Sequence, residues 1–272
     1  MVVSKKFKYE EVLVLKHGYG FVGSPKLFAH LFFVDGLLID TGQFKARNNI
    51  VSDTNDLKID QIFITHHHED HTGNIIPIKE KHRCKVLGSE ACMQLMKAPP
   101  KLSMVQKLIW GNREPYHDII PVGHVITTPK HSFDVIPVPG HAPDMVALYE
   151  PKKQWLFAAD LFINTYIGYF LDTESIAEQI ASIKHILPLD FKVMFCSHNP
   201  QLKNAKQQLA KKLDFLESTF DNVSALHQKG HTAIQIFKEL KLKENWPVKI
   251  ASMGYLSKMN MVKSIIRDIQ KK

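Results

Sequence analysis

Four metal-binding side chains fall within six consecutive positions of this 272-residue chain. Residues 65–72 read THHHEDHT, and the spacing His-x-His-x-Asp-His brings together His66, His68, Asp70 and His71. Imidazole nitrogens and carboxylate oxygens suit divalent zinc, iron or manganese, and one short loop cannot aim all four side chains at a single ion. Because alternate side chains of an extended segment share a face, we expect His66 and His68 to bind one ion and Asp70 and His71 to face a second. The chain must therefore fold so that two neighbouring metals are held.

Further residues of the same kinds follow apolar segments that have the character of strands. These residues are Asp40, His141, Asp160 and His198. In one case the apolar run Phe133–Val138 breaks at a Pro-Gly pair and leads directly into His141. Strand ends that meet at one edge of a sheet give a binding site rigid support. We therefore expect these later residues to complete the two-metal site.

Taken together, these segments resemble the metallo-β-lactamase superfamily of metal-dependent hydrolases, over roughly residues 10–200. The resemblance implies that the first metal is held by His66, His68 and His141, the second by Asp70, His71 and His198, and that Asp160 bridges both. Asp40 is similar to the supporting aspartate of the family, which orients a ligand histidine without touching metal. His67 and Glu69 occupy the variable positions of the motif and are predicted not to bind metal.

The resemblance also implies an α/β fold, a four-layer αβ/βα sandwich of two mixed β-sheets with helices outside. The hydrophobic pattern agrees, because strand-like segments alternate with helical ones. The expected strands include Tyr9–Leu15, Leu27–Ile39 with a hairpin turn at Asp35-Gly36, Ile59–Thr65, Met145–Tyr149, Trp155–Ala159 and Val193–Cys196. A helix capped by Thr173 is expected to bury Ile176, Ile180, Ile183 and Leu187.

The chain changes character after residue 200. Predicted helices there contain a stripe from Leu209 to Val223 that stops at Gly230, a capping-box signal at Thr232 and Gln235, and a last helix opened by Ser257. Residues 201–272 carry 14 Lys+Arg against 6 Asp+Glu, whereas the preceding residues balance at 21 against 21. Such asymmetry can mark contact with nucleic acid, a membrane surface or an acidic ligand, but we favour a solvated lysine-rich face. We expect a catalytic domain at 1–200 and a basic helical extension at 201–272, packed on or beside it.

Composition indicates in which cellular compartment the protein is expected. A content of 44% hydrophobic residues can bury one sizeable core. The longest apolar runs, such as Leu31–Val34, fall far short of the roughly 20 residues that cross a bilayer, and Met1–Glu10 has no export signal. Three cysteines without a paired framework suit a reducing compartment. We expect a cytoplasmic protein without a membrane partner and leave its oligomeric state open.

The resemblance and the ligand types together predict a hydrolase. Two divalent ions, with zinc favoured and manganese or iron as alternatives, would lower the pKa of a bridging water, and the hydroxide would attack a carbonyl carbon. The expected substrate is a small ester, thioester or lactone, with weak β-lactam hydrolysis as a side activity. Asp70 and Asp160 are the expected catalytic carboxylates. By resemblance to the lactonase branch, Tyr166, in an aromatic-rich segment after Asp160, is the candidate to position the substrate carbonyl.

Two alternatives stay open. The first is a phosphodiesterase or endoribonuclease of the same superfamily, because a smaller endoribonuclease branch also has a C-terminal helical extension; nucleic acid would then be the partner, and basic residues of the extension would face the metals. The second is a protein that retains the site but mainly binds a ligand. A short apolar helix expected at residues 103–110 would either cover the metals or pack as a structural element.

Overall fold

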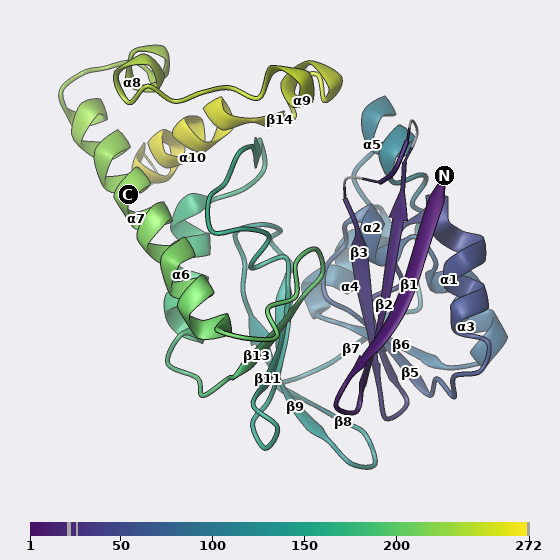
Figure 1. Cartoon of the computed structure of the whole chain (residues 1–272). Helices are drawn as coiled ribbons and strands as arrows, with labels where there is room; N and C mark the ends of the chain where they lie inside the picture. The colour runs from purple at the N-terminus through teal and green to yellow at the C-terminus, as the bar shows by residue number, and fades with distance from the viewer. Residues whose placement is uncertain (21–22, 26, 271–272) are drawn as a thin grey trace.

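The computed structural model describes residues 1–20, 23–25 and 27–270, and its two main β-sheets pack face to face with helices on both outer sides (Figure 1). The first sheet has seven strands, in the order β1 to β7. They are β1 (Val2–Tyr9), β2 (Val12–Tyr19), β3 (Ala29–Val34), β4 (Leu37–Ile39), β5 (Gln61–Ile64), β6 (Lys85–Gly88) and β7 (Ile120–Pro121). Neighbours from β1 to β4 are antiparallel and those from β4 to β7 are parallel. The sheet is therefore mixed.

The second sheet has five strands, in the order β13-β11-β10-β9-β8. They are β8 (Val125–Thr127), β9 (Ser132–Pro137), β10 (Val146–Glu150), β11 (Trp155–Ala159) and β13 (Val193–Cys196). Only the pair β11 and β13 is parallel within this sheet, and helix α6 (Ile176–Ile186) makes the crossover between them. A further small sheet pairs β12 (Phe170–Leu171) with β14 (Leu256–Ser257).

The helices divide between the two outer faces. Those that accompany the first sheet include α1 (Arg47–Asp53), α3 (Ile75–His82) and α4 (Glu90–Lys97), and those that accompany the second include α6, α7 (Ala205–Gln228) and α10 (Lys258–Gln270). The short elements are η1 (Phe44–Ala46), α2 (Glu69–Thr72), α5 (Met104–Ile109), α8 (Ala233–Glu239) and α9 (Trp246–Ala251).

Three apolar clusters show how these layers are held together. One cluster lies between the sheets, where the ring of Phe157 packs 5.7 Å from that of Phe32 and 4.7 Å from that of Phe195, measured between centroids. A second cluster joins the first sheet to α1, α3 and α4. A third joins the second sheet to α6, α7 and α10. The predicted four-layer αβ/βα sandwich of two mixed sheets is therefore confirmed.

The predicted hairpin at Asp35-Gly36 is confirmed, but two predicted boundaries are wrong. Asp35 and Gly36 both have positive φ, of 46° and 85°, as the two-residue turn between β3 and β4 requires. The strand expected at Tyr9–Leu15 is interrupted by the turn of another hairpin at residues 10–11, because β1 ends at Tyr9 and β2, which contains Val12–Leu15, begins at Val12. The cap of α6 is Ser175 rather than Thr173: its side chain accepts a hydrogen bond from the backbone nitrogen of Glu178.

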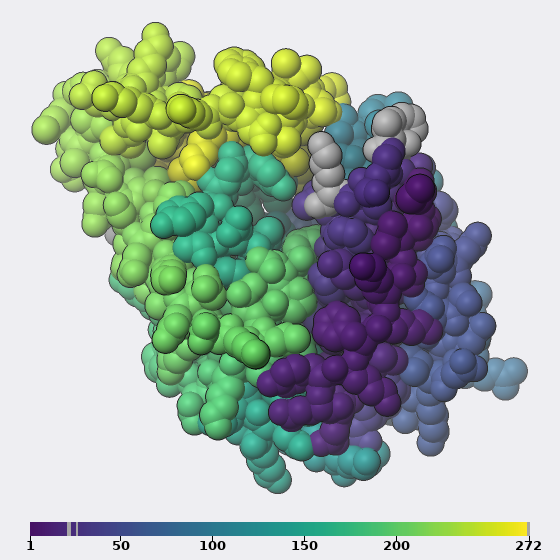
Figure 2. Space-filling model, in the orientation of Figure 1, coloured from purple at the N-terminus to yellow at the C-terminus, as the bar shows by residue number. Residues whose placement is uncertain are grey.

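The C-terminal residues form the helices predicted from their sequence, together with elements that the sequence did not indicate. Helix α7 ends shortly before Gly230, Thr232 caps α8 through the predicted capping box, and α10 follows Ser257. Helix α9 and the β12–β14 pair were not predicted. Figure 2 shows the residues of α8 and α9, in yellow-green to yellow, lying across one end of the molecule. The third apolar cluster contains residues from both sides of position 200, so the core does not divide there.

Within the described ranges, no helix combines the length and apolar character needed to cross a membrane.

Candidate metal centre

The histidine-rich loop leaves the end of β5 and is held in place by a buried aspartate. Asp40 follows β4, the strand next to β5, and has a positive φ of 62°. Its carboxylate accepts hydrogen bonds from the backbone nitrogen of Thr65 at 2.9 Å and from the Thr65 hydroxyl. The same carboxylate lies 2.7 Å from Nδ1 of His71. Asp40 thus occupies the supporting position that the resemblance implies for it.

We predicted an extended loop, but its second half is helical. His68 has extended backbone angles, but residues Glu69–Thr72 form the single helical turn α2. In an extended chain adjacent side chains point to opposite faces, so Asp70 and His71 could not both reach one ion. The helical turn solves this problem and directs both side chains toward the same centre.

Asp144 fixes the middle of the loop from the other side. Its carboxylate accepts a hydrogen bond from the backbone nitrogen of His67 at 2.8 Å and lies 2.7 Å from Nδ1 of the same residue. The His67 ring is therefore engaged by Asp144, and its expected absence from the metal ligands stays a prediction. Glu69, the other variable residue, is 3% exposed and lines the cavity described below.

Three histidine nitrogens converge on one point. Nδ1 of His68 lies 3.1 Å from Nε2 of His66 and 3.0 Å from Nε2 of His141. His66 and His68 leave β5 in the first sheet, whereas His141 follows β9 in the second. The cluster therefore forms only when the two sheets pack together.

A second cluster lies beside the first and contains Asp70, His71, Asp160 and His198. Nε2 of His198 is 3.2 Å from Oδ2 of Asp70 and 3.2 Å from Oδ2 of Asp160, and Nε2 of His71 is 3.4 Å from Oδ1 of Asp160. Oδ2 of Asp160 also lies 3.3 Å from Nε2 of His141, in the first cluster. Asp160 is thus in contact with both clusters, which is the position that a bridging ligand needs.

The second ring nitrogens of His141 and His198 contact protein groups that orient the rings. Nδ1 of His141 lies 2.5 Å from Oε1 of Glu174, and Nδ1 of His198 lies 2.8 Å from the carbonyl oxygen of Phe28. With a proton on Nδ1 donated to each acceptor, Nε2 presents its lone pair to the cluster. Such outer contacts set the tautomer and direction of metal-binding histidines.

Burial and charge differ between the two clusters. Burial, assisted by neighbouring histidines, holds the pKa values of His66 and His68 well below their usual range, so both rings stay neutral. Burial alone would also lower the pKa values of His71 and His198, but the carboxylates around them outweigh it and raise both well above the usual value. The second cluster therefore concentrates negative charge that favours a bound cation.

These residues fit a pair of divalent metal ions. Among the described residues, Nε2 of His71 and Oδ1 of Asp160 are buried without a hydrogen-bond partner, although each faces the other cluster members. Unpaired buried polar atoms are costly unless something binds them. Nitrogen and carboxylate donors in this number suit zinc, and also manganese or iron.

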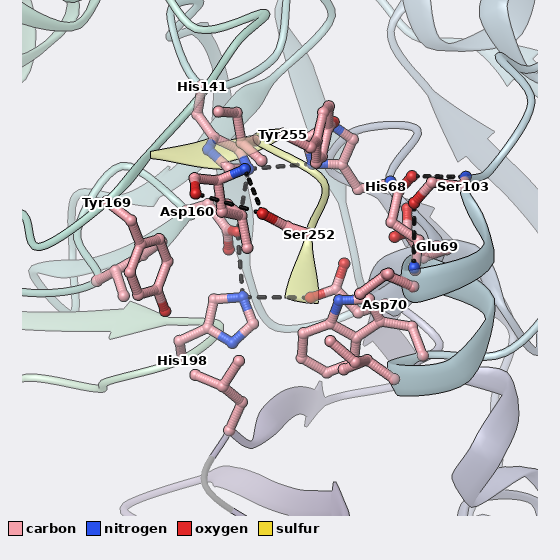
Figure 3. Close-up of a pocket in the computed structure, with 18 of the residues that line it drawn as sticks. His68, Glu69, Asp70, Ser103, His141, Asp160, Tyr169, His198, Ser252 and Tyr255 are labelled. Atoms are coloured by element: carbon pink, nitrogen blue, oxygen red, sulfur yellow. Dashed lines mark hydrogen bonds and ion pairs between the residues drawn. The ribbon is translucent and has the colours of Figure 1, made fainter. Parts of the chain in front are cut away.

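A cavity of about 150 Å³ opens directly above the two clusters (Figure 3). Its base is formed by His68, Asp70, His141, Asp160 and His198. Its walls are largely apolar. Val105, Ile109 and Trp110 belong to or follow α5, Tyr255 and Leu256 belong to the C-terminal extension, and the segment 163–171 contributes Ile163, Tyr169 and Leu171. Helix α5 thus contributes the apolar cover that was one of its two predicted roles.

The structure does not bring Tyr166 into this cavity. Its side chain is 71% exposed, and its ring packs edge-on against Phe215, 5.5 Å away between centroids. Tyr169, in the same aromatic-rich segment, and Tyr255 line the cavity instead. Sequence reasoning missed Glu174 and Tyr255 altogether, because neither has a spacing to the metal motif that would mark it. The role of Tyr166 stays a prediction.

The fold and this arrangement of ligands at the ends of strands are typical of metallo-β-lactamase-type proteins. Residues 34–198 match the model of the metallo-beta-lactamase superfamily, and the chain belongs to that superfamily. Among similar proteins is a hydroxyacylglutathione hydrolase from Legionella pneumophila (strain Corby), which is 30% identical over 156 residues. The match covers 56% of this chain and 53% of the relative, so the chain spans about half the length of the curated relatives it matches.

Solved structures agree on the fold. A metallo-beta-lactamase from Pontibacter korlensis has a TM-score of 0.63 at 19% identity, with 79% of this chain and 99% of that chain covered. A metallo-beta-lactamase family protein from Thermus thermophilus has a TM-score of 0.64 at 18% identity, with 80% of this chain and 83% of that chain covered. At such low identities the likeness establishes architecture and not activity.

Proposed function

We propose that the protein is a dinuclear metal-dependent hydrolase that cleaves a small ester, thioester or lactone at its carbonyl carbon. The observation that carries this proposal is the position of the Asp160 carboxylate between two ligand clusters at the base of a largely apolar cavity. A dinuclear site needs a shared ligand, and a carbonyl substrate needs an apolar space directly above the metals.

In this proposal each cluster holds one ion. His66, His68 and His141 would bind the first, Asp70, His71 and His198 the second, and Asp160 both. When bound, two divalent ions lower the pKa of a water and polarise a carbonyl oxygen. Zinc is the first choice for this set of donors, with manganese and iron as alternatives.

The protein supplies proton transfer and shielding from bulk water. Asp70 lines the cavity, and its Oδ2 lies 3.2 Å from Nε2 of His198. From this position the Asp70 carboxylate can accept the proton released by the attacking water and return it to the leaving group. The apolar side chains of α5 exclude solvent from the space where the new negative charge develops, and this strengthens its stabilisation.

The walls favour an uncharged substrate over an anionic one. Apolar atoms make up most of the lining surface, and the carboxyl groups of the lining include Glu69 and Glu174. The relatives named hydroxyacylglutathione hydrolase suggest a thioester, but glutathione carries carboxylates that would face these groups. We therefore place neutral esters and lactones first and a glutathione thioester second.

Among the described residues, no lysine or arginine lines the cavity, and this does not favour the phosphodiesterase alternative. The C-terminal residues that line it are Ser252, Tyr255 and Leu256, which are uncharged, whereas most lysines of the extension face solvent. A role in RNA cleavage would require basic side chains along the substrate path. The expected cytoplasmic location and the small-molecule partner both remain predictions.

The test is a substrate panel of neutral esters, lactones, hydroxyacylglutathione, phosphodiesters and a chromogenic β-lactam. We expect ester or lactone cleavage that disappears on chelation and returns with zinc. Asp160→Asn should lower kcat/KM by at least about 100-fold, because the shared carboxylate is lost. Asp118→Asn, which alters an exposed aspartate, is the matched control. Full activity in metal-stripped protein, or cleavage of phosphodiesters alone, would refute the proposal.

A further inference from the structure

Helix α10, which contributes no metal ligand, is connected to the metal centre by a short chain of hydrogen bonds. We propose that the C-terminal extension positions the metal ligand His141, by holding Glu174 against the Nδ1 atom of that ring. The inference rests on the proposed function in that it takes His141 to be a metal ligand. It assigns to the extension a role in metal affinity that its position after the catalytic residues does not suggest.

Glu174 is the direct contact to the ligand. Its side chain is largely buried, with 7% of the residue exposed, and it reaches the cavity from the segment between β12 and α6. Oε1 lies 2.5 Å from Nδ1 of His141, and Oε2 accepts a hydrogen bond from the backbone nitrogen of Leu171 at 3.0 Å. With both oxygens engaged, the carboxylate has one orientation, and so does the imidazole that donates to it.

Helix α10 holds the backbone of Glu174 itself. The carbonyl oxygen of Glu174 accepts hydrogen bonds from the Ser264 hydroxyl at 2.9 Å and from Nη2 of Arg267 at 2.7 Å. The Ser264 hydroxyl also accepts a hydrogen bond from the backbone nitrogen of Ile176, at 3.2 Å. Ser264 therefore joins the residues on both sides of Ser175 to the helix.

Further contacts hold the rest of this segment. Oδ2 of Asp268 accepts hydrogen bonds from the Ser175 hydroxyl at 2.9 Å and from the backbone nitrogen of Ala177 at 3.1 Å. Nδ2 of Asn260 donates to the carbonyl oxygen of Phe170 at 3.1 Å. The pairing of β12 with β14 adds backbone hydrogen bonds between the same two regions. Residues 170–177 are thus fixed along their length by residues 256–268.

A purely structural role for Glu174 does not account for this geometry. Ser175, and not Glu174, caps helix α6, so the Glu174 side chain is not needed to start the helix. Its carboxylate instead points at a ring whose other nitrogen, Nε2, belongs to the first ligand cluster. Removing an outer partner of a metal-binding histidine typically weakens metal affinity by about 10 to 100-fold.

The experiment measures metal affinity rather than hydrolysis. Metal-stripped protein is titrated with zinc in competition with a chromophoric chelator, and the cobalt(II) absorption spectrum reports the ligand geometry of each site. We expect Glu174→Ala to weaken one of two zinc sites by about 10 to 100-fold and to leave the other unchanged. Glu174→Gln should have a smaller effect, because the amide oxygen can still accept the hydrogen bond from Nδ1.

The decisive variants lie on α10. Ser264→Ala and Arg267→Met touch no ligand, yet they should weaken the same zinc site several-fold and change the same cobalt bands. Glu178→Gln, on an exposed position of α6, and Ser218→Ala, on an exposed position of α7, are matched controls that should leave both affinities at the wild-type level. Circular dichroism of the metal-free variants tests whether they fold. If Glu174→Ala or Arg267→Met does not fold, the conservative variants Glu174→Gln and Arg267→Lys are measured in their place.

Each outcome bears on a separate claim. Wild-type zinc affinities in the Glu174 variants would overturn the inference, and so would wild-type affinities in both α10 variants when Glu174→Ala weakens binding. A wild-type protein that binds a single ion would contradict the dinuclear function. The inference about Glu174 would then be judged on the affinity for that one ion.

Discussion

Lys212 is a buried cation directly behind the metal centre. It belongs to α7, is 3% exposed, and donates a hydrogen bond from Nζ to the carbonyl oxygen of Leu161 at 2.7 Å. Leu161 follows Asp160, so this lysine supports the backbone that carries the shared carboxylate. Burial lowers the pKa of Lys212 from 10.5 to about 8, despite the opposing influence of Glu174 and Asp160. The folded protein therefore holds this proton less tightly than the unfolded chain does.

The sign of the resulting pH effect follows from this difference in pKa. Below pH 8 both states are protonated and the folded state bears the full cost of the buried charge. Between pH 8 and 10.5 the folded state loses its proton first, so stability rises with pH. We expect the free energy of unfolding of metal-free wild type to rise by about 2 to 3 kcal/mol relative to Lys212→Met across this range. Urea unfolding at several pH values measures it, with the exposed Lys211→Met as control. Parallel pH curves for wild type and Lys212→Met would contradict the assignment.

Individual elements differed in how well the sequence predicted them. Strands that end in a ligand, and the hairpin at Asp35-Gly36, were predictable because apolar runs and turn residues are local signals. The first hairpin was missed because its turn, Glu10-Glu11, lacks the glycine or asparagine that usually marks such turns. The helical turn α2 was missed because it depends on both Asp70 and His71 facing one centre, which is a property of the assembled site. Helix α9 and the β12–β14 pair lack a periodic pattern long enough to detect.

Helix α5 is the element whose stability should control access to the cavity. It spans six residues, none of them buried, so its N-terminal capping box is a large part of what holds it. Ser103 accepts a hydrogen bond from the backbone nitrogen of Gln106 at 3.2 Å, and the Gln106 side chain accepts one from the Ser103 backbone nitrogen at 2.9 Å. Losing the cap would favour local opening over global unfolding.

We therefore expect Ser103→Ala to cost about 1 kcal/mol locally, which should raise KM for an apolar ester several-fold while the melting temperature changes little. Amide hydrogen exchange of residues 104–109 should become faster. Thr232→Ala removes the equivalent capping box of α8, which does not line the cavity, and serves as the matched control. Equal KM values for the two variants would show that α5 does not cover the substrate.

At the scale of the whole molecule, the metal centre is a product of the packing of the two sheets. The histidine-rich loop extends from β5 of the first sheet, whereas His141, Asp160 and His198 follow strands of the second sheet. The candidate ligands could be predicted from the sequence because metal chemistry restricts their types, and because the family resemblance implies their places at strand ends. The cavity walls could not, because α5 and the C-terminal residues meet the ligands only through tertiary contacts. Residues of the extension pack in the third apolar cluster and line the cavity. The predicted domain boundary at residue 200 stays a prediction.

The proposed function depends on two neighbouring metal ions that share Asp160 as a ligand. An anomalous difference map, recorded at the zinc absorption edge from crystals of the zinc-loaded protein, tests it most directly. We expect two peaks, one among His66, His68 and His141 and the other among Asp70, His71 and His198, with the Asp160 carboxylate contacting both. A single peak, or peaks at which Asp160 is not a ligand, would contradict it.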